Sequence, residues 1–292
     1  MDKNIDDLLS GGYKFIEDNQ KEIACLLIHG FAASPKELIP LANYLKSELD
    51  IYAPLLPGHG TTIDDLDKKK FTEWISCANQ VYEYLNNNYK KVIIIGFSMG
   101  GTIGLHLSKK KSPYKLITIS SPIDLLDLKF VTTKIKEQWK LNNLSVKKII
   151  AEIETVSKLK NAKTDKSIDK TKLVINNIYK KIWDNRLKSA KTEKLIKYID
   201  TYDSLSYHAL KELFFLIHVT NKDLKKVTAP ILIIHSTKDE MVPINNVSII
   251  LDKISSDNAE RFIVHNSNHQ IPLDVDSDLV QKKIKEFINR AI

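Results

Sequence analysis

The sequence contains little cysteine and no long apolar run, which argues against a disulfide-stabilised protein and against a membrane-spanning one. Cysteine occurs only twice among the 292 residues, as Cys25 and Cys77. Both lie in apolar stretches, so we expect buried thiols and not a disulfide framework, with no metal and no cofactor. No run of about 18 apolar residues could span a bilayer as a helix. Residues 1–7 lack the basic-then-apolar order of a signal peptide, which predicts a cytoplasmic location.

Glycine and proline are absent from one long part of the chain. All nine glycines lie between Gly11 and Gly104, and no proline occurs between Pro122 and Pro230. Apolar residues in 123–206 recur at helical spacing between lysine-rich faces, and no stretch there indicates a strand. We therefore expect residues 123–206 to form a lysine-rich helical insertion.

The net charge of +8 is confined to this insertion. Residues 123–206 hold 19 Lys plus Arg against 11 Asp plus Glu, and the rest of the chain holds 25 of each kind. Such a surface is most often solvated, and weak attraction to anionic lipid surfaces or acidic substrates is the second interpretation. The lysines are not interleaved with aromatic residues as in a nucleic-acid-binding segment, so we expect no nucleic-acid partner. The oligomeric state stays open.

Apolar and amphipathic stretches alternate on both sides of the insertion. Apolar runs that predict strands cover residues 13–17, 22–28, 51–53, 92–95, 116–119, 230–235 and 261–264. Stretches with helical spacing cover residues 38–45, 71–85, 102–110, 210–219, 247–254 and 279–292. The alternation is typical of an α/β fold, in which a mostly parallel sheet carries helices on both faces. We expect residues 1–122 and 207–292 to form this core and residues 123–206 to form an inserted cap.

A glycine-rich turn follows the β-branched run at residues 92–95. Ser98 lies in this turn, with Gly96 and Gly100 two positions away on either side. Gly-x-Ser-x-Gly between a strand and a helix is the pattern of a nucleophile elbow, in which a strained serine presents its hydroxyl at the carboxyl edge of the sheet. A plain glycine-rich turn and a phosphate-binding loop are the alternatives, but no lysine follows Gly101. We predict that Ser98 is a nucleophile.

Two further polar residues follow predicted strands and can activate this serine. Asp239 lies after the strand at 230–235, and His269 lies in the loop after the last strand. Because the carboxyl ends of parallel strands share one edge, we expect Ser98, Asp239 and His269 to meet there as nucleophile, orienting acid and general base. The chain order Ser, Asp, His is the one that this type of fold uses. The backbone N–H groups of Phe31 and Met99 are the predicted donors to an oxyanion.

Other histidines and acids compete for these roles. The remaining histidines lie in turns, helices or strands, where structural roles are expected: His29, His59, His106, His208, His218, His235 and His265. Asp274 and Asp276 are expected to be solvated or to cap a turn, because neither lies directly after a predicted strand as Asp239 does.

Several motifs resemble the α/β-hydrolase superfamily, and within it the bacterial carboxylesterase and monoacylglycerol-lipase-like group. They are LIHGF at 27–31, LANYL at 41–45, APLLPGHG at 53–60, GFSMGG at 96–101, and Asp239 with Val242 and Pro243. The resemblance covers residues 20–122 well and 207–292 moderately, but hardly covers the insertion. It implies an α/β-hydrolase fold, a cap over the acyl site and hydrolysis of carboxylic esters through an acyl intermediate on Ser98.

The sequence departs from this group at two positions where glycine is common. Ser236 stands before the loop of the acid, and Asn268 stands immediately before the histidine. Asparagine tolerates positive φ better than most residues, so we expect Asn268 to replace glycine in that conformation. The insertion of about 84 residues is also longer than is usual in the group.

The preferred function is therefore that of a serine esterase acting on short- to medium-chain carboxylic esters or monoacylglycerols. A thioesterase or a lysophospholipase could use the same three residues. A binding protein that keeps the scaffold without turnover is an alternative of a different class. The acyl length and the alcohol of the substrate do not follow from the sequence.

Overall fold

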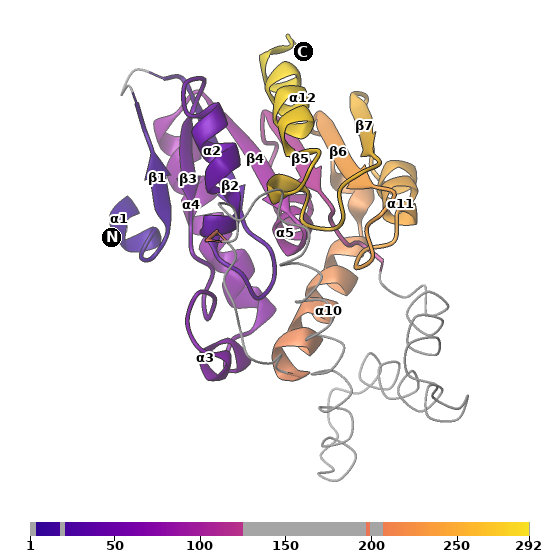
Figure 1. The fold of residues 1–292 in the computed structure, drawn as a ribbon. Coiled ribbons are helices and arrows are strands. Elements are labelled where there is room, and N and C mark those ends of the chain that lie inside the picture. Colours follow the sequence, from indigo (N-terminus) through magenta and orange to yellow (C-terminus); the bar gives the residue numbers. More distant parts are fainter. Residues whose placement is uncertain (1–3, 18–20, 125–196, 199–206, 292) are drawn as a thin grey trace, which may run out of the picture.

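A single β-sheet forms the centre of the computed structural model, which describes residues 4–17, 21–124, 197–198 and 207–291 (Figure 1). Its strand order is β1-β3-β2-β4-β5-β6-β7. The strands are β1 (Tyr13–Phe15), β2 (Ile23–Ile28), β3 (Asp50–Ala53), β4 (Lys91–Phe97), β5 (Lys115–Ile119), β6 (Ile231–Ser236) and β7 (Ala259–Val264). Only β1 runs antiparallel to its neighbour. The seven predicted strands and the mostly parallel sheet are thus confirmed.

Alternate residues of β4 show that both faces of the sheet are covered. Ile94 packs in one buried cluster, whereas Ile93 and Ile95 pack in a second one. Successive side chains of a strand point to opposite faces, so the two clusters lie on opposite sides of the sheet. A strand that is buried on both faces needs a nearly continuous apolar sequence, which is the run that predicted β4.

Helices cover the two faces unequally. One face carries α1 (Ile5–Leu8), α3 (Ile63–Asp67), α4 (Phe71–Asn88), α5 (Met99–Ser108), α10 (Tyr207–Asn221) and α11 (Asn245–Lys253). The other carries α2 (Ile39–Leu45) and α12 (Ser277–Asn289). Short 3₁₀ turns occur at η1 (Pro35–Leu38), η2 (Leu224–Lys226) and η3 (Ile271–Leu273). Two helices, α1 and α3, were not predicted, because four or five residues are too few to show helical periodicity.

The start of the predicted insertion is tied to the core. Asn246 accepts hydrogen bonds from the backbone N–H groups of Ile123 and Asp124, both at 2.7 Å, through its Oδ1 atom. The side chain of Asn221 donates to the carbonyl of Ile123 at 3.0 Å. The remainder of the predicted cap lies outside the described residues, except for 197–198. Its helical structure and its boundaries at 123 and 206 stay predictions.

The two cysteines differ in their surroundings. Cys25 is fully buried in β2, and this burial raises the pKa of its thiol. Cys77 on α4 is only partly buried. The expectation of a buried thiol therefore holds for Cys25 alone. Within the described part of the chain, no helix is both long enough and apolar enough to cross a membrane.

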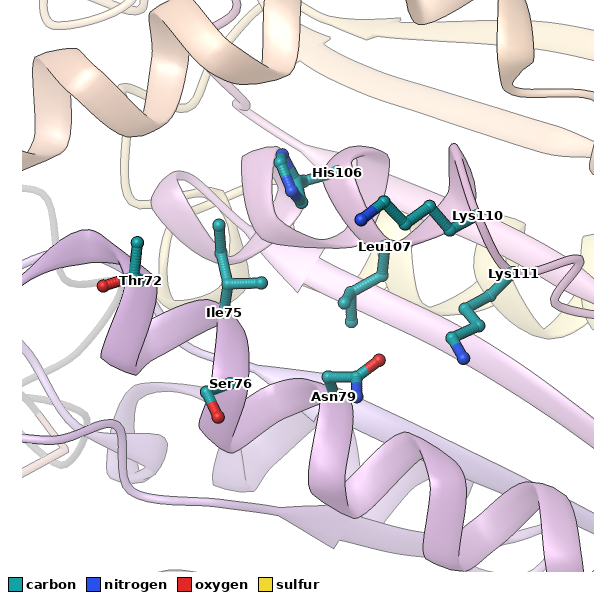
Figure 2. Close-up of a pocket in the computed structure, with 8 residues that line it drawn as sticks. All are labelled: Thr72, Ile75, Ser76, Asn79, His106, Leu107, Lys110 and Lys111. Atoms are coloured by element: carbon teal, nitrogen blue, oxygen red, sulfur yellow. The ribbon is translucent and has the colours of Figure 1, made fainter.

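A cavity of about 350 Å³ lies between α4 and α5 (Figure 2). Its lining consists of Thr72, Ile75, Ser76, Asn79, His106, Leu107, Lys110 and Lys111. None of the three residues predicted to act as nucleophile, acid and base belongs to this lining. The cavity is therefore separate from the predicted catalytic residues.

Candidate active site

Ser98 lies at the sharp turn between β4 and α5. Its backbone has φ 51° and ψ −120°, a conformation that is unfavourable for a residue with a side chain. The neighbouring glycines are required by space. A Cβ atom on Gly96 would lie 2.3 Å from the carbonyl oxygen of Gly100, and one on Gly100 would lie 2.1 Å from that of Ile28. The local geometry is that of a nucleophile elbow.

The structure brings Ser98, His269 and Asp239 together, as the sequence predicts. The hydroxyl of Ser98 lies 3.0 Å from Nε2 of His269, and Nδ1 of His269 lies 2.8 Å from Oδ2 of Asp239. Asp239 follows β6 and His269 follows β7, so both arrive at the edge of the sheet where β4 ends. With Nδ1–H donating to the carboxylate, Nε2 is free to accept the proton of the serine.

Asp239 is held as a carboxylate by several donors. Its Oδ1 atom accepts hydrogen bonds from the backbone N–H groups of Met241 and Val242, both at 2.9 Å. Burial acts to raise the pKa of Asp239. The charge and hydrogen bond of His269, aided by His235 and the N–H of Val242, outweigh burial and lower that pKa below its ordinary value. A group in this state can orient an imidazole and stabilise its charged form.

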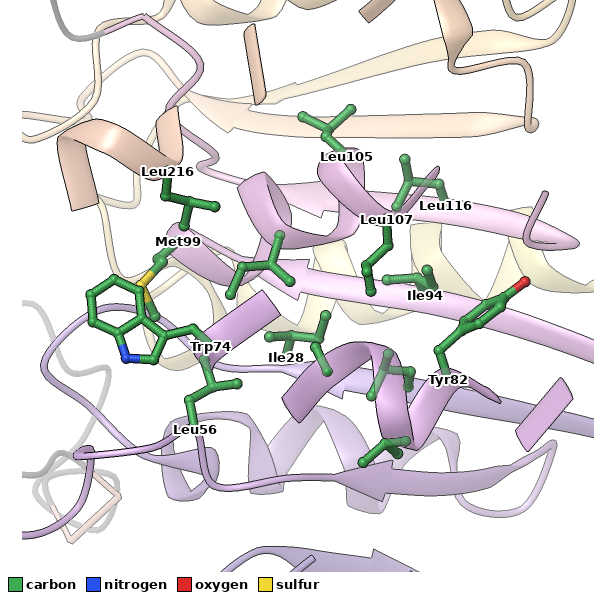
Figure 3. Packing of buried hydrophobic residues seen from close by; sticks show 14 of the residues in the cluster. Ile28, Leu56, Trp74, Tyr82, Ile94, Met99, Leu105, Leu107, Leu116 and Leu216 are labelled. Carbon is green, nitrogen blue, oxygen red and sulfur yellow. The ribbon is translucent and has the colours of Figure 1, made fainter. Parts of the chain in front are cut away.

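Of the two predicted oxyanion donors, Met99 directly follows the serine in the chain, and Phe31 lies in the loop after β2. Met99 is the first residue of α5, where backbone N–H groups have no partner within the helix. Its side chain is buried with Trp74 of α4 and Leu216 of α10, which anchors the start of α5 (Figure 3). Phe31 follows Gly30, and Ala32 after it has a positive φ of 50°. Among the described residues, neither N–H donates to another protein group, so both are available to a ligand.

Of the two interpretations given for Asp274 and Asp276, the solvated one is wrong because both side chains are buried, and the turn-capping one fits because both accept hydrogen bonds from backbone N–H groups. Oδ2 of Asp276 accepts from the N–H groups of Asn266 and Ser267 at 2.9 and 2.7 Å. Oδ2 of Asp274 accepts from the N–H of Asn268 at 2.7 Å. Three successive N–H groups just before His269 are therefore held by carboxylates. The only sequence signal for this was the position of two acids five and seven residues after the histidine.

The two departures from glycine also contribute hydrogen bonds to this loop. The hydroxyl of Ser236 donates to the carbonyl of Ser267 and accepts from the N–H of Lys238. Asn268 does not have a positive φ, so that prediction is wrong. Its Oδ1 atom accepts instead from the N–H groups of His269 at 2.7 Å and Glu240 at 3.3 Å. Side-chain hydrogen bonds, and not an unusual backbone conformation, fix the loop here.

His29 and His59 lie against the oxyanion loop and have structural surroundings, as predicted. Nε2 of His29 accepts from the N–H of Leu56 at 3.1 Å. The ring of His59 contacts the rings of His29, Phe31 and Trp74 edge-on. Burial, with a further contribution from His29, lowers the pKa of His59 well below its usual value. The neutral ring of His59 therefore packs against Phe31.

The sheet topology and the elbow define an α/β-hydrolase. The family model of serine aminopeptidase, S33, matches residues 19–276, and the chain belongs to this family. A thermostable monoacylglycerol lipase of Bacillus sp. (strain H-257) is 26% identical over 282 residues, which cover 96% of this chain and 95% of the lipase. A carboxylesterase of Bacillus subtilis (strain 168) is 20% identical over 269 residues, which cover 91% of this chain and 92% of the esterase.

Solved structures show the same fold. A chain from a study of two metagenome-derived lipolytic enzymes, LipS and LipT, has a TM-score of 0.68 at 20% identity and covers 97% of this chain and 99% of its own length. The monoacylglycerol lipase of Paleococcus ferrophilus has a TM-score of 0.65 at 13% identity, with 94% and 96% covered. The resemblance to the α/β-hydrolase superfamily stated from the sequence motifs is confirmed.

Proposed function

We propose that this serine hydrolase cleaves short- to medium-chain carboxylic esters, with monoacylglycerols as the preferred class, through an acyl intermediate on Ser98. One observation carries the proposal: Ser98, whose backbone is strained, is hydrogen-bonded to His269 at 3.0 Å, and His269 is hydrogen-bonded to Asp239 at 2.8 Å. The choice of ester over peptide is supported by the two relatives that match over nearly the whole chain, which are named as a monoacylglycerol lipase and a carboxylesterase.

The proposed reaction has two halves. Ser98 Oγ attacks the carbonyl carbon of the ester while Nε2 of His269 takes its proton. The N–H groups of Phe31 and Met99 stabilise the oxyanion of the tetrahedral intermediate. The C–O bond then breaks, and the alcohol leaves with the proton from His269. Water attacks the acyl-enzyme in the same manner, which releases the carboxylic acid and restores the serine.

The lysine-rich segment and the cellular location are secondary parts of the proposal. Attraction of residues 123–206 to anionic lipid surfaces is supported by their excess of positive charge alone. A cytoplasmic location stays a prediction. Neither is required for ester hydrolysis.

The experiment compares Ser98→Ala with wild type on p-nitrophenyl butyrate, a monoacylglycerol, an acyl thioester, a lysophospholipid and an aminoacyl p-nitroanilide. We expect wild type to prefer the oxygen esters, and kcat to fall by on the order of 10⁴ or more in Ser98→Ala with an unchanged circular dichroism spectrum. Ser248→Ala, an exposed serine on α11, is the matched control. A fluorophosphonate should label wild type and Ser248→Ala but not Ser98→Ala. Turnover retained by Ser98→Ala would overturn the proposal. If wild type cleaves the aminoacyl p-nitroanilide faster than the esters, its substrates are peptides and not esters.

A further inference from the structure

A buried carboxylate links the loop of the oxyanion donor to the loop of the histidine. Glu37 lies in η1 and is only 2% exposed. Its Oε1 atom accepts from the backbone N–H of Gly30 at 2.6 Å, and its Oε2 atom accepts from the side-chain amide of Gln270 at 2.8 Å. Helix-start rules suggest that an acid at this position interacts with the end of its own helix. Here both oxygens point to other segments.

The two partners of Glu37 are the chain neighbours of two site residues. Gly30 precedes Phe31, whose N–H is a proposed oxyanion donor, and Gln270 follows His269, the proposed base. Gln270 is 1% exposed, so its amide has no bulk water as a substitute partner. The backbone carbonyl of Gln270 accepts from the N–H of Leu273 at 2.9 Å, which ties the backbone at Gln270 to the turn η3. One side chain therefore spans the gap between the two loops.

The space around Gly30 makes this contact close and specific. A Cβ atom at Gly30 would lie 3.1 Å from Oε1 of Glu37 and 3.3 Å from the ring of Phe97. The ring of Phe97 in turn lies 5.3 Å from the ring of His269, centroid to centroid. The carboxylate, the backbone of Gly30 and the ring of Phe97 thus pack together beside the base. A displacement of Glu37 would therefore move both the loop of Phe31 and the loop of His269.

We infer that Glu37 is a positioning residue that sets the separation between the oxyanion donor of Phe31 and the imidazole of His269. The inference rests on the function proposed above. Catalysis of acyl transfer requires both groups to be held within about 0.5 Å of their working positions relative to the serine. Neither Gly30 nor Gln270 touches the reacting atoms, so Glu37 acts through its neighbours and not on the substrate.

The amide of Gln270 allows a conservative variant to keep the link. In Glu37→Gln, the amide oxygen can still accept from Gly30, while the new amide nitrogen can donate to Gln270 once the Gln270 amide has turned over. In Glu37→Ala both hydrogen bonds are lost. In Gln270→Ala only the half that leads to the histidine loop is lost, which makes it the milder variant.

The first measurement is steady-state hydrolysis of p-nitrophenyl butyrate by these variants. We expect kcat to fall by about 10- to 100-fold in Glu37→Ala with KM within about twofold of wild type. A displaced N–H of Phe31 weakens stabilisation of the transition state but hardly affects binding of the substrate. Gln270→Ala should fall by about 5- to 20-fold, the double alanine variant should be no worse than Glu37→Ala, and Glu37→Gln should stay within about threefold of wild type. Glu48→Ala, a carboxylate paired with Lys285, is the control with unchanged kcat.

The second measurement is amide hydrogen exchange, which does not depend on turnover. Exchange should accelerate in both the 29–32 and the 267–271 segments of Glu37→Ala, and in neither segment of Glu37→Gln or Glu48→Ala. Wild-type kcat in Glu37→Ala, equal loss in Glu37→Gln and Glu37→Ala, or faster exchange in only one segment would each overturn the inference. If wild type neither turns over ester nor reacts with a fluorophosphonate, the proposed function fails, and the exchange pattern alone decides whether Glu37 links the two loops.

Discussion

Nε2 of His235 lies 3.6 Å from Oδ2 of Asp239, the same oxygen that accepts the hydrogen bond from His269. The same Nε2 atom is also 3.0 Å from the carbonyl oxygen of Val242, in the segment whose N–H groups bind the other oxygen of Asp239. Burial lowers the pKa of His235, although the charge of Asp239 acts against this. A neutral His235 then directs an N–H toward Val242 and Asp239. Asp239 therefore has a donor on each oxygen, the N–H groups of Met241 and Val242 on Oδ1 and His269 on Oδ2, with His235 close to Oδ2 as well.

We predict that Asp239→Asn lowers kcat by on the order of 10⁴ at pH 7. The amide would donate a hydrogen to Nδ1 of His269, so that Nε2 carries the proton and cannot accept the one from Ser98. Asp252→Asn on the exposed side of α11 is the control. The measurement is kcat for p-nitrophenyl butyrate, with thermal unfolding as a check on the fold. A loss smaller than tenfold would show that Asp239 does not orient the base.

We predict that Asp276→Ala both destabilises the protein and lowers kcat. Three donors lose their acceptor, the N–H groups of Asn266 and Ser267 and the side-chain amide of Asn266, and we expect about 1–3 kcal/mol less unfolding free energy. The loop of His269 would also be less well fixed, so kcat should fall by about tenfold with little change in KM. Urea unfolding and steady-state kinetics measure the two effects. Asp257→Ala, before β7, should change neither.

We predict that Asp276 also contributes to the loss of stability in acid. Burial acts to raise the pKa of Asp276, but the hydrogen bonds from Asn266 and Ser267 outweigh it and lower that pKa below 3.8. Its stabilising contribution is therefore complete above pH 3.8 and is lost as pH falls through the lower, folded value. Below pH 3.8, wild type should lose stability more steeply than Asp276→Ala. Parallel curves for the two proteins would contradict this assignment.

We predict that His106 contributes to loss of stability in mild acid. Burial, together with the charges of Lys109 and Lys110, lowers the pKa of His106 from 6.5 to about 4. Between these values the unfolded chain binds a proton that the folded chain does not, so stability falls as pH falls from 6.5 to about 4. Because the side chain is partly exposed at the cavity shown in Figure 2, we expect an effect of only about 2–4 °C in Tm.

The test for His106 compares Tm with pH in wild type and His106→Asn. The variant replaces the imidazole by an uncharged amide near Thr220, whose hydroxyl lies 3.2 Å from Nδ1 of His106 in wild type. The fall in Tm between pH 6.5 and 4.5 should be smaller in His106→Asn, whereas His265→Asn, at an exposed position, should follow wild type. An equal or steeper fall in His106→Asn would refute the prediction. Other buried histidines are present in both proteins and cancel in the difference.

Strand ends were the part of the site that could be predicted from sequence. Apolar runs located β4, β6 and β7, and parallel strands must end at one edge, so Ser98, Asp239 and His269 followed from order alone. The groups that hold these residues could not be found in this way. Asp276 and Ser236 act through backbone atoms of a loop whose path has no periodic signal. The link made by Glu37 could not be found either, because its partner Gln270 lies more than two hundred residues away in the chain.

The parallel pairing of β5 with β6 determines how freely the site can be remodelled. The register aligns Ile117 with Leu232, although roughly a hundred residues of chain separate the two strands. For a flexible connection, the free-energy cost of closure grows only with the logarithm of its length, about 0.6 kcal/mol for each doubling. That is less than the effect of an average point mutation. Changes in chain length that leave α10 in place can therefore accumulate with little effect on the stability of the sheet, so the number of residues between Asp124 and α10 can diverge while the elbow at Ser98 is maintained.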